Sequence, residues 1–155
     1  MKRSLLLFFA ALTLVLASCS KSSTTLTAAQ QAAADDAAIQ AYISANNIKA
    51  TKDSSGLYYQ IITPGTGAYP NVNATVEVNS VGKLLNGTVF DTENSLKTTL
   101  TGTIKGWQIG VPHINTGGRI LLIVPSALGY GTAGSGSSIP ANAVLVFTID
   151  LLGFN

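Results

Sequence analysis

The 155-residue sequence contains a single cysteine, a single histidine and a single tryptophan. One cysteine excludes an internal disulfide framework, and the lone His113 has no second ligand beside it in the sequence, so no metal-binding motif is present. The sequence also lacks a phosphate-binding glycine loop and the motifs of a hydrolase triad. We therefore expect no metal and no cofactor.

Charged residues are also scarce, at 10% of the chain. The formal net charge is +2, but Lys2 and Arg3 lie in a segment that we expect to be removed, which leaves seven of the nine basic side chains against seven acidic ones. This balance, without any basic cluster, excludes nucleic acid as an expected partner. Fifteen glycines and the shortage of Glu, Lys and Arg favour a β-rich fold over a helical bundle.

Residues 1–18 have the pattern of a signal peptide. A basic start is followed by an apolar core from Leu5 to Leu16, which is too short for a comfortable membrane span. The sequence Leu16-Ala17-Ser18-Cys19 resembles the bacterial lipobox, in which the cysteine becomes the first residue and is acylated. We expect Cys19 to be lipidated, so that more than one acyl chain anchors a periplasmic or outer-membrane lipoprotein in the bacterial cell envelope.

Residues 19–56 are predicted to form the lipidated tether and to contain one alanine-rich helix, over 27–46. Thr27 and Gln30 match a capping box, and Asn46-Asn47 is typical of a left-handed helix stop. The helix could dock on the domain, pair with another copy or act as a spacer. We favour the spacer because large apolar side chains on this helix are few.

Residues 57–155 predict one folded domain of strands around a short helix. Strands are expected at 57–62, 74–82, 88–91, 119–124 and 143–151. Alternation places Ser80 on the apolar face of 74–82, and it gives 143–151 one unbroken apolar face: Ala143, Leu145, Phe147, Ile149 and Leu151. Asn86-Gly87 predicts a two-residue hairpin between the second and third strands. We expect 49–56 to be a polar joint, 92–103 to be loop-like, and the long loop 126–140 to be functional or mobile.

The sequence Ile104-Lys105-Gly106-Trp107-Gln108-Ile109-Gly110 predicts the short helix. Gly106 and Gly110 limit its length, whereas Ile104, Trp107 and Val111 form one apolar stripe that a sheet must cover.

Five segments, taken in order, resemble the FKBP-type peptidyl-prolyl isomerases. They are Gly87-Thr88-Val89-Phe90-Asp91, Ile104-Lys105-Gly106-Trp107, Gly117-Gly118-Arg119, Leu128-Gly129-Tyr130-Gly131 and Ile139-Pro140-Ala141-Asn142-Ala143-Val144-Leu145-Val146-Phe147. The resemblance extends over about 57–152 and implies an α+β fold, with a twisted antiparallel half-barrel sheet wrapped around one short helix. The N-terminal helical extension and the lipobox resemble exported bacterial members of the family.

The resemblance also implies an apolar pocket for a prolyl ring, with Trp107 at its floor. The implied catalytic residues are Phe90, Asp91, Ile104, Trp107, Tyr130 and Phe147, and the implied substrate contacts are Ser80, Leu96, Thr103 and Ile139. No nucleophile is needed, because the Tyr130 hydroxyl and the Ile104 backbone N–H are expected to donate to substrate carbonyls. The implied partners are proline-containing polypeptides and macrolides such as rapamycin.

The sequence departs from the family at several of these positions. Ser80 stands where the family usually has tyrosine, Leu96 where it has phenylalanine and Thr103 where it has valine. The segment after Asp91 is several residues shorter and lacks the arginine that often pairs with this aspartate. We therefore expect a broader pocket and modest turnover. The alternative is that neighbouring side chains have repacked into the space beside Ser80.

Three functions fit these observations. The first is a lipid-anchored prolyl isomerase that assists the folding of exported proteins, and the second is a binding module or chaperone with little turnover. The third, a purely structural lipoprotein, leaves the joint presence of the motifs unexplained. The residues alone also allow simpler roles: core packing for Trp107, Phe90 and Phe147, loop anchoring for Tyr130, and a solvated hairpin charge for Asp91.

Overall fold

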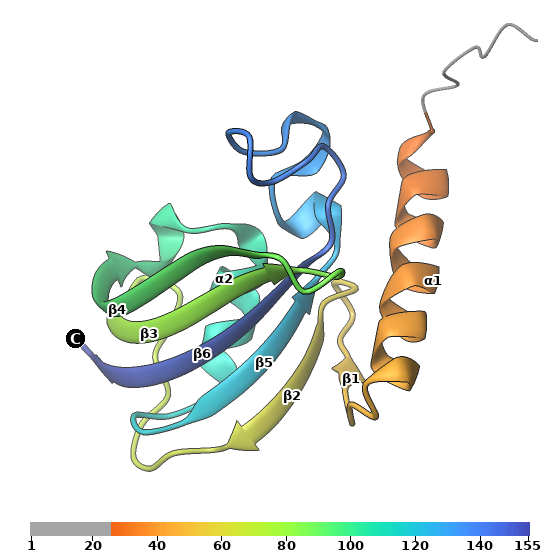
Figure 1. The fold of residues 1–155 in the computed structure, drawn as a ribbon. Coiled ribbons are helices and arrows are strands. Elements are labelled where there is room, and N and C mark those ends of the chain that lie inside the picture. The colour runs from red at the N-terminus through yellow and green to blue at the C-terminus, as the bar shows by residue number, and fades with distance from the viewer. Residues whose placement is uncertain (1–25) are drawn as a thin grey trace, which may run out of the picture.

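The computed structural model describes residues 26–155, so the predicted signal peptide and Cys19 lie outside the described residues. Six antiparallel strands form one curved sheet in the order β1-β2-β5-β6-β3-β4 (Figure 1). The strands are β1 Thr51–Lys52, β2 Tyr58–Thr63, β3 Thr75–Leu84, β4 Val89–Thr99, β5 Arg119–Val124 and β6 Leu145–Phe154. The helices are α1 Ala28–Ala45 and α2 Lys105–Gly110, with 3-10 turns η1 Leu100–Gly102, η2 Val111–His113, η3 Ser126–Leu128 and η4 Gly131–Ala133.

This architecture confirms the predicted sheet around one short helix with an N-terminal helical extension. Within residues 26–155, no helix is long and apolar enough to cross a membrane.

The main core lies between the concave face of the sheet and α2. Alternate residues of β6 point inward and are buried, as the sequence predicted: Leu145, Phe147, Ile149 and Leu151. From α2, Trp107 and Val111 enter the same core, and Ile104 packs against it while partly exposed. The apolar stripe predicted for this helix is therefore covered by the sheet.

The two glycines of α2 let the helix backbone lie directly on β5. A Cβ atom on Gly106 would lie 2.5 Å from Val124 Cγ1, and one on Gly110 would lie 2.5 Å from Leu122 Cδ2. Residues four apart share one face of a helix, so both glycines face the same strand. The sequence prediction gave these glycines only the role of ending the helix, whereas the structure shows that they set its distance from the sheet.

Strand β4 is longer than predicted. The segment 92–103 was expected to be a polar loop, but the strand continues to Thr99, where it pairs with Thr75 of β3. Leu96 and Thr98 are half-buried and Leu100 is fully buried, whereas Lys97 and Thr99 are exposed. An edge strand with one solvated face carries many polar residues, which explains why its composition resembled that of a loop.

The hairpin before β4 also differs from the prediction. The turn is closed by the Gly87 N–H, which donates to the Leu84 carbonyl at 2.9 Å, so Leu85 and Asn86 are its central residues. Gly87 is left-handed, with φ of 87°, but Asn86 is not. The Asn86 side-chain oxygen accepts the Thr88 N–H at 3.0 Å, which favours this turn over the predicted two-residue form.

Helix α1 begins and ends as the sequence predicted. The Thr27 hydroxyl accepts the Gln30 N–H at 3.2 Å, and the Gln30 side-chain oxygen accepts the Thr27 N–H at 2.9 Å, which completes the capping box. Asn46 is the C-cap, and Asn47 is left-handed with φ of 53°.

The spacer interpretation of α1 is wrong, because the helix docks on the convex face of the sheet (Figure 1). Ile39 is fully buried there in a second core cluster with Tyr58, Ile123, Val144 and Val146. Ile123 lies between Leu122 and Val124, which face α2, so the two helices cover opposite faces. One large apolar residue, supported by Tyr42 and Ile43, is enough because the sheet supplies the rest of the apolar surface.

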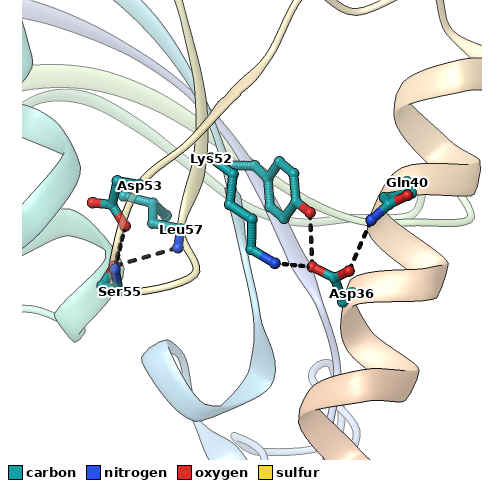
Figure 2. A network of polar contacts seen from close by, with 7 residues as sticks. Asp36, Gln40, Lys52, Asp53, Ser55 and Leu57 are labelled. Atoms are coloured by element: carbon teal, nitrogen blue, oxygen red, sulfur yellow. Dashed lines mark hydrogen bonds and ion pairs between the residues drawn. The ribbon is translucent and has the colours of Figure 1, made fainter.

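A polar network holds α1 against the first two strands (Figure 2). The Asp36 carboxylate accepts the Tyr58 hydroxyl at 2.7 Å and the Gln40 side-chain amide at 2.8 Å, and it pairs with Lys52. The hydrogen bond from Lys52 holds the pKa of Asp36 below its ordinary value. Lys52 belongs to β1, which lies inside the segment 49–56 that was predicted to be only a polar joint. The structure instead pairs β1 with β2.

Adding a methyl group to Gly110 should destabilise the protein. In most helices Gly→Ala is favourable by about 1 kcal/mol, but here the new Cβ would meet Leu122, and overpacking costs roughly 1–3 kcal/mol. We expect Gly110→Ala to lower the free energy of unfolding in a urea titration. The control is Gly153→Ala, because a Cβ there meets nothing within 4 Å. A Gly110→Ala protein as stable as the wild type would contradict the proposed contact.

Candidate functional site

A cavity of about 680 Å³ opens on the concave side of the sheet. It is lined by Phe90, Asp91, Leu96, Thr98, Gly102, Thr103, Ile104, Trp107, Tyr130, Ser135, Gly136, Ser138, Ile139 and Phe147. These residues come from β4, the η1–α2 segment, the loop 126–140 and β6. Nine of the ten residues that the sequence predicted for a pocket therefore line one cavity, and Ser80 is the exception.

Three aromatic rings form the base of the cavity. The Phe147 ring centroid lies 5.5 Å from both the Trp107 and the Phe90 centroids, with interplanar angles of 87° and 84°. Such edge-to-face pairs are favourable beyond the area that they bury. Trp107 and Phe147 are 5% and 4% exposed, so the floor is fixed by core packing.

Gly82 of β3 makes room for this aromatic group. A Cβ atom at this position would lie 2.5 Å from Phe90 Cε2 and 3.0 Å from Phe147 Cε1. The sheet can therefore present both rings to the cavity only while this position carries no side chain.

The turn before α2 is held by hydrogen bonds at the cavity edge. The Thr103 hydroxyl donates to the Leu100 carbonyl at 2.7 Å, and the Gln108 side-chain amide donates to the Thr103 carbonyl at 2.7 Å. Ile104 is the N-cap of α2, with extended backbone angles. This arrangement fixes the backbone of Ile104 at the wall of the cavity.

The loop 126–140 forms the outer wall and is internally hydrogen-bonded. Ser135 and Ile139 exchange backbone hydrogen bonds of 2.9 and 3.1 Å, and the Asn142 N–H donates to the Gly131 carbonyl at 2.8 Å. Tyr130 is 40% exposed at the cavity mouth. The loop thus brings an amphipathic phenol to the edge of an apolar floor.

The cavity has little ionisable character. Asp91 is the one lining carboxylate and is half-buried. Among residues 26–155, no group of three His, Cys, Asp or Glu side chains could hold a metal ion. The arrangement suits binding of a compact apolar group with a polar backbone beside it.

Comparison with known proteins decides the family. Residues 67–152, more than half of the chain, match the model of the FKBP-type peptidyl-prolyl cis-trans isomerase family. The FKBP-type peptidyl-prolyl cis-trans isomerase FkpA of Escherichia coli K12 is 42% identical over 109 residues, which cover 67% of this chain and 40% of that protein. The chain belongs to the FKBP family.

Solved structures agree with this assignment. The crystal structure of FkpA from Escherichia coli matches with a TM-score of 0.72 at 35% identity, over 82% of this chain and 62% of that one. A peptidyl-prolyl cis-trans isomerase from Pseudomonas syringae matches with a TM-score of 0.70 at 29% identity, over 85% of this chain and 98% of that one. The chain spans less than half the length of several curated FKBP relatives.

Ser80 requires a correction to the expected FKBP pocket. It was predicted to contact substrate and to leave space for a broader ligand, but it is 2% exposed and does not line the cavity. Its backbone pairs with Glu93 of β4 and Ile149 of β6, where a register shift interrupts the β3–β4 ladder. Ser80 is therefore enclosed at the position where the family resemblance led us to expect a tyrosine ring.

Two buried polar atoms near the FKBP core have no hydrogen-bond partner within residues 26–155. They are Ser80 Oγ and Trp107 Nε1. An unsatisfied buried hydroxyl costs about 1–3 kcal/mol. The indole N–H belongs to a residue that lines the cavity, so a bound ligand is a candidate acceptor for it.

Five lining residues were missed by the sequence analysis: Thr98, Gly102, Ser135, Gly136 and Ser138. The alternation of Leu96, Thr98 and Leu100 would have placed Thr98 beside the cavity if 92–103 had been recognised as an edge strand. Small polar loop residues such as Ser138 carry no comparable signal.

Replacing Ser80 by alanine should leave the protein as stable as the wild type or make it more stable. The substitution removes the unsatisfied hydroxyl and leaves only a small void, so we expect a gain of up to about 1 kcal/mol in the free energy of unfolding. Ser126→Ala is the matched control, because that buried hydroxyl is hydrogen-bonded and its removal should destabilise. Equal losses in both variants, measured by thermal unfolding, would contradict the assignment.

Proposed function

We propose that this chain is a peptidyl-prolyl cis-trans isomerase that acts on proline-containing polypeptides. The observation that carries the proposal is the cavity, where a rigid aromatic floor of Trp107, Phe147 and Phe90 adjoins the half-exposed Tyr130. A prolyl ring is compact and apolar, so it fits such a floor. The family to which the chain belongs supports the same activity.

The proposed mechanism needs no covalent step. Rotation about the X–Pro bond must break amide resonance, against a barrier of about 18–20 kcal/mol. Burial of the prolyl ring on Trp107 removes water from the adjoining amide, and a twisted amide is less penalised in that setting than a planar one. The Tyr130 hydroxyl and the Ile104 N–H, as the FKBP resemblance implies, donate to substrate carbonyls and hold the chain on both sides of the rotating bond.

Asp91, Leu96, Thr103 and Ile139 complete the proposed substrate site. Leu96 and Thr103, together with Thr98, form a wall without an aromatic ring. The family resemblance predicted phenylalanine in place of Leu96 and valine in place of Thr103. This wall favours the second candidate function, a prolyl-peptide-binding or chaperone module with low turnover. Binding without catalysis would result if the ring is held but the amide stays hydrated. Macrolides of the rapamycin type are proposed as alternative ligands of the same cavity.

The proposed location is the bacterial cell envelope, where a lipid anchor at Cys19 holds the protein. The proposed clients are exported proteins that are still folding. The support is the N-terminal sequence: Lys2 and Arg3, the apolar core from Leu5 to Leu16, and the lipobox-like residues that end at Cys19. Removal of residues 1–18 would leave the lipidated segment 19–56, whose helix α1 docks on the FKBP-type domain of 57–155.

Tyr130→Phe should lower the rate of prolyl isomerisation without affecting the fold. The substitution removes one hydroxyl from a 40% exposed side chain, and the loss of a hydrogen bond of about 1–1.5 kcal/mol in the transition state lowers kcat/KM by roughly tenfold. The measurement is a coupled assay on a short prolyl peptide.

Tyr69→Phe is the matched control, because Tyr69 is 61% exposed and does not line the cavity. An unchanged kcat/KM in Tyr130→Phe would remove the hydroxyl from the mechanism. A wild-type protein that binds prolyl peptides without accelerating isomerisation would favour the binding module.

Cys19→Ser should release the protein from the membrane fraction or leave it unprocessed, because an oxygen replaces the sulfur that the lipid attachment requires. Fractionation of expressing bacteria and measurement of the mature mass test this expectation. Ser23→Ala, four residues further along the tether, should remain processed and membrane-bound. Membrane recovery and mass unchanged by Cys19→Ser would overturn the proposed anchor.

A further inference from the structure

Asp35 of α1 is a buried carboxylate with a defined set of donors. It is 3% exposed. One carboxylate oxygen accepts the Ser126 N–H at 2.8 Å and the Ser126 hydroxyl at 2.6 Å, and the other accepts the Gln31 side-chain amide at 2.7 Å. Since a buried carboxylate is costly when its partners are lost, the bonds from Ser126 contribute to holding α1 on the domain.

Ser126 begins the segment that forms the outer wall of the cavity. It is the first residue of η3, and the preceding Pro125 has no side-chain oxygen with which to cap that turn. The acceptor for the Ser126 N–H comes instead from Asp35, 91 residues earlier in the chain. The start of the loop 126–140 is thus fixed by the N-terminal helix.

The same segment leads directly to Tyr130. The Leu128 N–H donates to the Pro125 carbonyl at 2.9 Å, and the Gly129 N–H donates to the Ser126 carbonyl at 3.0 Å. Gly129 lies against Leu145, because a Cβ there would be 3.1 Å from Leu145 Cδ1. A short hydrogen-bonded turn therefore connects Ser126, which Asp35 binds, to Tyr130 at the cavity mouth.

We propose that Asp35 is a positioning residue: by binding Ser126 it fixes the loop 126–140, and this contact sets how well the cavity holds a prolyl ligand. The identity of the ligand rests on the proposed function, but the coupling between helix and loop does not. Coupling of this kind is reciprocal, so a ligand that orders the loop also strengthens the contact between Asp35 and Ser126.

The next residue of the helix supplies the comparison. Asp36 also holds α1 to the domain, but its partners Lys52 and Tyr58 lie on β1 and β2, which contribute no residue to the cavity (Figure 2). These two adjacent carboxylates of α1 therefore have different roles. Asp36 fastens the helix to the first strands, whereas Asp35 fastens the loop to the helix.

The test compares Asp35→Asn, Ser126→Ala and Asp36→Asn in the full chain. Hydrogen exchange of residues 126–140 is measured together with the global stability, and KM and kcat are measured separately on a prolyl peptide. We expect Asp35→Asn to speed exchange of the loop by roughly tenfold or more and to raise KM more than it lowers kcat. Ser126→Ala retains the backbone hydrogen bond, so its effect should be smaller, and it should nearly vanish in the Asp35→Asn background.

Asp36→Asn should loosen residues 51–58 but leave the exchange of 126–140 and KM at wild-type values. If it changes the loop as much as Asp35→Asn does, general docking of the helix accounts for the effect and the proposal is overturned. Unchanged loop exchange in a folded Asp35→Asn protein also overturns it. If Asp35→Asn does not fold, Ser126→Ala alone tests the proposal: faster exchange of 126–140 with a raised KM supports it, and unchanged exchange overturns it.

Failure of the proposed function has a different signature. A wild-type protein that neither binds nor isomerises prolyl peptides would refute the function, while the exchange of 126–140 would still decide whether Asp35 fixes the loop.

Discussion

The closest approach between α2 and β5 is the constraint on which the rest of the domain depends. Gly106 and Gly110 leave no side chain between the helix backbone and Val124 and Leu122. Larger residues would lift the helix away from the sheet and carry Trp107 away from Phe147. Packed interiors transmit small displacements. The position of the cavity floor therefore depends on the two glycines as much as on the aromatic rings.

Strand β5 connects the two faces of the sheet through its alternation. Leu122 and Val124 face α2 and the cavity side, whereas Ile123 faces α1. The strand ends at Val124, and only Pro125 separates it from Ser126, where the loop that walls the cavity meets α1. The helix on the convex face can thus reach the site on the concave face without crossing the core. A two-sided sheet needs apolar residues on both faces of this strand, and its nearly continuous apolar sequence reflects that requirement.

The sequence predicted best where one physical signal was strong and unopposed. The alternation along β6, the capping box at Thr27 and the stripe that includes Trp107 each follow from a single local pattern. The predictions failed where two requirements competed. Edge exposure made β4 polar enough to resemble a loop, and the few apolar residues of α1 concealed its docking, because Val144, Val146 and Ile123 provide most of that interface.

The cavity residues could be predicted because most of them also serve the core. Trp107 and Phe147 are buried whether or not a ligand binds, so the pattern that specifies the fold also specifies the floor. Ser80 shows the limit of that inference. Its inward position was correctly derived from alternation, yet alternation cannot tell whether a small inward residue leaves an open pocket or is enclosed by its neighbours. A register shift lies beside Ser80 in the β3–β4 ladder, and such a shift is a property of two strands together. Residues that act through pairing between distant segments, such as Ser80 and Asp35, therefore require the structure, whereas residues that act through burial alone do not.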